Sequence, residues 1–184
     1  MKKFEPKQQI YFDNAASTPI DPRVQKAMRS VESDAYGNPS SLHGCGVKSQ
    51  MALSQARKIV ARFLHGHEDE IIFTSGGTES NHLALLGTLG DAEKSCHVIT
   101  SAIEHPSVLE PLKRLSREGK IELEIVPVDA DGIVSIQGII SRLRRDTRLV
   151  SIMLANNEIG TIQPIAEIGR VLLRWRKDRG TEWP

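Results

Sequence analysis

The chain has 184 residues and a formal net charge of +1, because 24 Lys and Arg side chains nearly balance 23 Asp and Glu side chains. This balance argues against a nucleic-acid binder that depends on bulk charge, while 39% hydrophobic residues are enough for a globular core. The two cysteines lack a Cys-x-x-Cys spacing and no run of eighteen apolar residues occurs, so we expect a cytoplasmic protein without disulfides or a membrane span.

The N-terminal part predicts two helices separated by a break. Asp21 and Pro22 are typical of a helix cap and first helical position. The polar stretch 36–41 interrupts the chain, and a long amphipathic helix follows and ends at 65–69. That end carries two histidines beside acidic residues, but it lacks other spaced ligands and predicts a surface turn rather than a metal site. We divide the chain into an N-terminal segment at 1–35 and a larger domain at 36–184.

From Glu70 onward, short apolar runs alternate with helical patterns. The expected strands are 70–74, 97–100, 121–126 and 149–154, and the expected helices begin at Thr78, near 107, around 136 and at Ile165. This alternation predicts an α/β fold with a mostly parallel sheet and helices on both faces.

The glycine pair Gly76-Gly77 lies between an expected strand and an expected helix. Unpaired N–H groups and the helix dipole favour an anion at such a point, and Ser75 and Thr78 add hydroxyl donors. The spacing matches neither the dinucleotide nor the P-loop pattern. Taken alone, the stretch fits a phosphate or carboxylate site and an ordinary turn capped by Thr78 equally well.

Three loops that follow expected strands carry polar motifs: 75–78, 102–107 and 155–161. Because the chemistry of parallel sheets lies at the carboxyl ends of the strands, we expect these loops to meet at one edge. His105 alone would more simply be a structural histidine, but beside the other loops its ring is suited to stack on a ligand and to handle a proton. Asn157 is either a turn residue or a neutral hydrogen-bond partner for a ligand oxygen.

Five motifs in this order resemble the cysteine desulfurases of the class V aminotransferase family. They lie at 11–18, 37–43, 73–81, 104–109 and 156–164, and the resemblance extends from about residue 10 to about residue 180. It implies the aspartate aminotransferase-like fold of the pyridoxal 5'-phosphate (PLP)-dependent transferases. The expected reaction converts L-cysteine to L-alanine and leaves persulfide sulfur on the enzyme for an acceptor such as an iron–sulfur scaffold protein.

The resemblance also implies roles for individual residues. Gly77 and Thr78 would bind the cofactor phosphate, and His105 would stack on the pyridine ring as a candidate acid–base catalyst. Asn157 would lie near the cofactor 3'-oxygen, and the stretch 14–16 would line the substrate entrance. A homodimer is expected for the complete enzyme.

Family members are about twice as long as this chain. The acidic residue that pairs with the pyridine nitrogen, the lysine of a Ser-x-His-Lys motif and the persulfide cysteine would all come later. Asp129 matches a surface turn of the family, and Cys45 and Cys96 do not match the sulfur-accepting loop. We therefore expect an incomplete PLP-binding domain that lacks desulfurase turnover and has poor solubility on its own.

Two alternatives remain open. One is another class V enzyme such as a selenocysteine lyase, which shares the glycine pair and the histidine. The other is a non-catalytic chain that only associates with a homologue. The basic run at 174–179 predicts the solvated face of the last helix rather than a nucleic-acid site.

Overall fold

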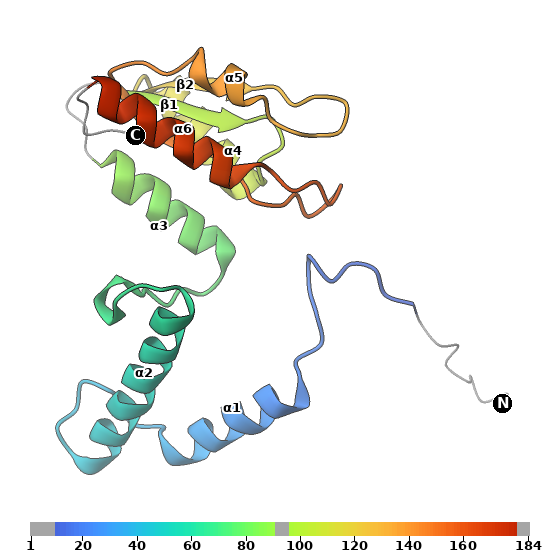
Figure 1. Ribbon diagram of the computed structural model, residues 1–184. Coiled ribbons are helices and arrows are strands. Elements are labelled where there is room, and N and C mark those ends of the chain that lie inside the picture. The colour runs from blue at the N-terminus through green and yellow to red at the C-terminus, as the bar shows by residue number, and fades with distance from the viewer. Residues whose placement is uncertain (1–9, 91–95, 180–184) are drawn as a thin grey trace, which may run out of the picture. The chain divides into compact units, whose positions relative to one another are not determined.

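The computed structural model describes residues 10–90 and 96–179. Its internal contacts divide the chain into two compact units, Met1–Phe73 and Thr74–Pro184 (Figure 1). Among the described residues, no helix is both long and apolar enough to cross a membrane.

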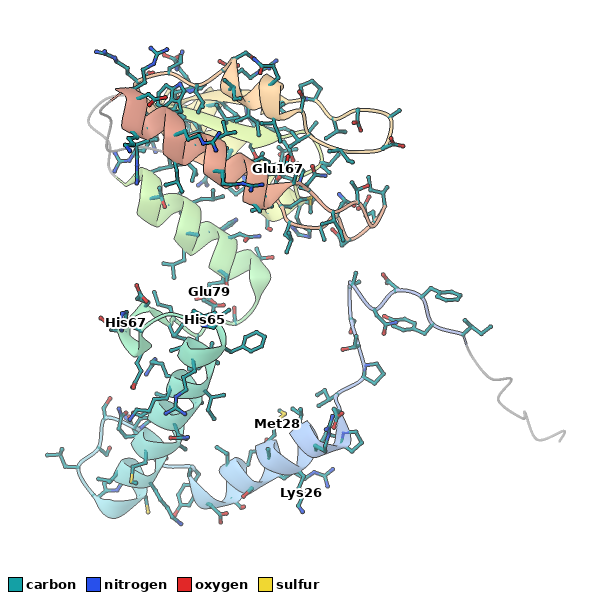
Figure 2. All side chains as sticks on the ribbon, viewed as in Figure 1. Lys26, Met28, His65, His67, Glu79 and Glu167 are labelled. Atoms are coloured by element: carbon teal, nitrogen blue, oxygen red, sulfur yellow. The ribbon has the colours of Figure 1, made fainter. Side chains whose placement is uncertain are left out.

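The first unit begins with helix α1, Pro22–Asp34. Its start confirms the expected cap, since the Asp21 carboxylate accepts the N–H of Arg23 at 2.7 Å and Pro22 takes the first helical position. Met28 and Lys26 lie on opposite sides of the helix (Figure 2). The apolar side remains exposed, and Val24, Met28 and Val31 each keep about half of their surface accessible.

Helix α2, Gly44–Phe63, and a short 3₁₀ helix, Glu68–Glu70, complete this unit. The strand expected at 70–74 is wrong, because 71–74 has no strand pairing and the side chains of Ile72 and Phe73 are exposed. Its backbone is held by a side chain instead: Arg57 Nε donates to the Ile71 carbonyl at 3.2 Å. The same guanidinium lies 5.4 Å from the centre of the Phe73 ring.

The second unit is built on a three-stranded parallel sheet. Its strands are β1 at Cys96–Ser101, β2 at Ile121–Val126 and β3 at Thr147–Ser151, in the order β2-β1-β3. The helices are α3 at Gly77–Leu89, α4 at Pro106–Arg117, α5 at Ile136–Ile140 and α6 at Ile165–Arg179. Within this unit, the expected alternation of strands and helices and the parallel pairing are confirmed.

Helices cover both faces of this sheet, as expected (Figure 1). Successive side chains of a strand point to opposite faces, so Val98 and Ile99 of β1 enter two different cores. The Val98 core packs against α3 and α4 through residues such as Leu85 and Leu112. The Ile99 core packs against α5 and α6 through Ile139 and Ile168.

Candidate functional site

The strand order creates a switch point beside β1. From β1 the chain passes through α4 to β2 on one side, and from β2 through α5 to β3 on the other side. The loops that leave the carboxyl ends of β1 and β3 therefore start from neighbouring strands and run to helices on opposite faces. Ligands of open α/β sheets bind in the crevice that such a divergence creates.

The start of α3 supplies unpaired backbone donors. The first intrahelical bond runs from Ser80 N to the Gly76 carbonyl at 3.1 Å, and Gly76 contributes no side-chain cap. Amides of the first helical turn have no acceptor within the helix. A Cβ atom placed on Gly76 or Gly77 would meet no heavy atom within 4 Å, so the space beside these two Cα atoms is open. Gly77 and Thr78 are exposed there.

One donor expected from the sequence is already used inside the protein. The Ser75 hydroxyl and the Ser75 N–H both donate to Oε2 of Glu79, at 2.6 and 2.7 Å. Both bonds lower the pKa of Glu79 and keep its side chain ionised, and the bond from the hydroxyl has the larger effect. Figure 2 shows Glu79 at the N-terminal end of α3. Ser75 therefore holds the loop, and the amides of Gly77 and Thr78 and the Thr78 hydroxyl remain as donors for an anion.

His105 ends the loop after β1 and forms the N-cap of α4. Its Nδ1 accepts the N–H of Ser107 at 3.0 Å and lies 2.7 Å from the Ser107 hydroxyl oxygen. The ring is otherwise exposed. Ser107 also accepts from Nδ2 of Asn81 in α3 at 2.8 Å. These bonds connect Asn81, at the start of the second turn of α3, to the histidine loop.

In the loop after β3, the side-chain amides of Asn156 and Asn157 have different surroundings. Asn156 holds the loop, because its Oδ1 accepts the N–H groups of Glu158 and Ile159 at 2.8 and 3.0 Å. Its Nδ2 donates to the Ile103 carbonyl in the histidine loop at 3.0 Å. Asn157 is exposed, and within the described residues its side chain makes no hydrogen bond, so its amide is available to a ligand.

Glu104 makes a second connection between the same two loops. Its Oε1 accepts the Ser101 hydroxyl at 2.6 Å and the N–H of Met153 at 2.8 Å. The side chain is only 8% exposed, and this burial raises the pKa of Glu104 in spite of the two bonds. A buried carboxyl group thus joins the carboxyl ends of β1 and β3.

The predicted site residues lie on three segments that hydrogen bonds connect. Gly77 and Thr78 belong to the first turn of α3, His105 to the loop after β1, and Asn157 to the loop after β3. The residues that make the connections, Asn81, Glu104, Ser107 and Asn156, all lie inside the sequence motifs but received no role there. Together the segments offer anion donors, an exposed aromatic ring and a neutral amide, a set suited to a phosphorylated aromatic ligand.

Comparison with known proteins gives consistent matches. The profile of the aminotransferase class-V family matches residues 10–176. The chain is 46% identical over 163 residues to cysteine desulfurase IscS 1 of Archaeoglobus fulgidus, and 45% identical over 166 residues to cysteine desulfurase IscS of Dictyoglomus turgidum. These matches cover 88% and 90% of this chain but 42% of each relative. The chain thus spans less than half the length of the curated relatives it matches.

Solved structures show the same fold. A NifS-like protein superimposes with a TM-score of 0.86 at 40% identity, covering 91% of this chain and 46% of that one. A structure described as SspA in complex with cysteine gives a TM-score of 0.81 at 38% identity, covering 90% of this chain and 48% of that one. These similarities confirm the fold class expected from the motifs.

Proposed function

Because this chain belongs to the class V aminotransferase family, we propose that it is the N-terminal part of a PLP-dependent cysteine desulfurase. The relatives named above carry that activity in their names. The proposed reaction of the whole enzyme takes L-cysteine to L-alanine and transfers the sulfur to an acceptor, such as an iron–sulfur scaffold protein. One related structure is described as holding cysteine, which supports the choice of substrate.

The observation that carries this proposal is the hydrogen-bonded connection of three loops at one edge of the sheet. Asn81 and Ser107 connect α3 to the histidine loop, and Glu104 and Asn156 connect that loop to the segment after β3. The residues present fit PLP by their chemistry. The open amides at Gly77 suit a phosphate, and the exposed imidazole of His105 suits the face of a pyridine ring.

Each residue has a distinct task in this proposal. The N–H groups of Gly77 and Thr78 and the Thr78 hydroxyl bind the phosphate dianion at the positive end of the α3 dipole. His105 stacks on the ring and fixes its plane, and Asn157 donates a hydrogen bond to the 3'-oxygen without adding charge. When bound, PLP supplies the electron-withdrawing ring that the bond-breaking chemistry requires.

We predict that the 184-residue chain alone produces no alanine from L-cysteine. Its sequence contains no Ser-x-His-Lys motif, so it lacks the lysine that would hold PLP covalently in this family. Chromatographic assay of alanine after incubation of the purified chain with PLP and L-cysteine measures this directly. Alanine formation above that of free PLP would contradict the prediction.

Binding of pyridoxamine 5'-phosphate tests the site itself. This probe carries the phosphate and the ring but needs no lysine to bind. We expect Gly77→Ala to weaken binding about tenfold or more, because glycine permits the closest approach of a phosphate to its backbone N–H and an added methyl group hinders that approach. Gly87→Ala is the matched control, since Gly87 lies in the same helix and its Cβ would also meet no heavy atom within 4 Å.

Isothermal titration calorimetry of the three proteins gives the result. If wild type and Gly77→Ala bind pyridoxamine 5'-phosphate with equal affinity, the phosphate does not bind at Gly77. Absence of binding to the wild type would favour the non-catalytic alternative, in which the chain only associates with a homologue.

The proposal extends to the location and the assembly of the protein. A cytoplasmic location agrees with the two cysteines, which are both unpaired, Cys45 exposed and Cys96 buried. The homodimer follows from the family resemblance. The proposal includes neither a metal nor a nucleic-acid partner.

A further inference from the structure

The hydrogen bonds around His105 determine which ring nitrogen carries the proton. Nδ1 lies 3.0 Å from the backbone N–H of Ser107, a group that can only donate. Pro106 has no N–H, so Ser107 provides the first amide of α4 that the capping side chain can accept. Nδ1 is therefore the acceptor, and a neutral imidazole with an accepting Nδ1 carries its hydrogen on Nε2.

The Ser107 hydroxyl strengthens this arrangement. Its oxygen accepts from Nδ2 of Asn81 at 2.8 Å and lies 2.7 Å from Nδ1 of His105. Because the oxygen already accepts a hydrogen from Asn81, the hydroxyl hydrogen is available to point at the ring. Ser107 is 8% exposed, so little water competes for these bonds.

We infer that Asn81 and Ser107 are positioning residues that hold the neutral His105 ring as its Nε2–H tautomer. In this tautomer the hydrogen is on Nε2, while Nδ1 accepts within the protein. The other neutral tautomer, with its hydrogen on Nδ1, would displace the N–H and O–H of Ser107. The inference rests on the proposed function only for the identity of the ligand.

The hydrogen bonds from Asn81 through Ser107 to His105, called the relay below, also join two parts of the proposed site. Asn81 lies three residues after Thr78 in α3, so it shares the first turns of the helix that would bind the phosphate. A change at Asn81 is therefore expected to alter the imidazole without removing any anion donor. That separation makes it possible to test the histidine apart from the phosphate site.

Nitrogen-15 NMR of the whole chain, labelled at histidine, reads the tautomer directly. The His105 signals are assigned by their loss in His105→Gln, and the remaining histidines serve as internal references. We expect a pyridine-type resonance for Nδ1 and a pyrrole-type resonance for Nε2 in the neutral ring. The opposite pattern would overturn the inference.

Substitutions test the relay. Ser107→Ala keeps the backbone N–H but removes the shorter bond, so we expect the His105 signals to shift toward a mixture of tautomers. Affinity for pyridoxamine 5'-phosphate should fall about fivefold, the usual effect of one hydrogen bond. Asn81→Ala should act in the same direction without altering α4, and it remains informative if Ser107→Ala does not fold.

Ser116→Ala, in the same helix but outside the relay, is the control and should leave tautomer and affinity unchanged. Relay variants that behave like this control would overturn the positioning role. If the wild type shows the Nε2–H tautomer but does not bind the probe, the proposed function fails while the tautomer assignment stands.

Discussion

At the scale of single residues, the side chain of Glu104 connects the ends of two strands. Its burial disfavours the charged form of the carboxyl group. Its pKa is raised in the folded state, so between the unfolded and folded pKa values the folded chain binds more protons than the unfolded chain. The stability that Glu104 contributes is present below its unfolded pKa, about 4.3. It is lost as pH rises through the raised folded value.

The variant Glu104→Gln keeps an oxygen that can accept from Ser101 and Met153, but its side chain cannot ionise. We expect its free energy of unfolding, relative to wild type, to increase from pH 4 to pH 7. Urea unfolding across this range measures the difference, and a constant difference would contradict the account. Glu104→Ala also lacks the ionisable group but leaves the Met153 N–H without its acceptor, so it should be about 1–3 kcal/mol less stable than Glu104→Gln at every pH.

Sequence reasoning identified the segments of the site better than the tasks of their residues. Ser75 and Thr78 were equivalent as hydroxyl donors in the sequence, yet only Ser75 is taken by Glu79. Likewise the pair Asn156-Asn157 divides into one amide that holds the loop and one that is exposed. These differences depend on which side chain points inward at a turn, and neither periodicity nor motif spacing contains that information.

At the scale of elements, the turn before α2 depends on close backbone contact. A Cβ on Gly46 would lie 2.8 Å from the Asn38 carbonyl oxygen and even closer to that of Ser41. We expect Gly46→Ala to destabilise this turn and the start of α2 by about 1–3 kcal/mol, the usual cost of overpacking. Gly44→Ala is the control, because its Cβ would meet no heavy atom within 4 Å.

Amide hydrogen exchange in the first turns of α2 measures this locally. Faster exchange in Gly46→Ala than in wild type, with Gly44→Ala unchanged or slower, is the expected result. Equal exchange in the two variants would show that the turn tolerates a side chain at both glycines.

Most of the expected strands and helices are present in the structure, but one short apolar run is not a strand. The strand expected at 121–126 has those bounds in the structure, and the last helix begins at Ile165 as expected. The run at 70–74 has strand-forming residues but no neighbouring strand in the described chain, so Arg57 binds its backbone instead. Whether a short apolar run pairs with another strand depends on the tertiary fold, which the run itself does not reveal.

The expected boundary between an N-terminal segment at 1–35 and a larger domain at 36–184 stays a prediction.

At the scale of the whole molecule, the family resemblance drawn from five motifs is confirmed by the family profile across residues 10–176. The described sheet leaves β3 at one edge, and large apolar side chains are exposed nearby along the chain, among them Leu154, Ile159, Ile162 and Leu173. Exposed apolar surface and an open strand edge favour association. The expected poor solubility of the chain alone stays a prediction.

The central claim is that three loops of this chain form one site for a phosphorylated pyridine ring. Titration of the labelled protein with pyridoxamine 5'-phosphate, followed by NMR, tests it most directly. The account predicts that the amides of Gly77 and Thr78, the His105 ring and the Asn157 side chain shift together and saturate with a single dissociation constant. Shifts confined to one of the three loops, or with different constants for different loops, would contradict it.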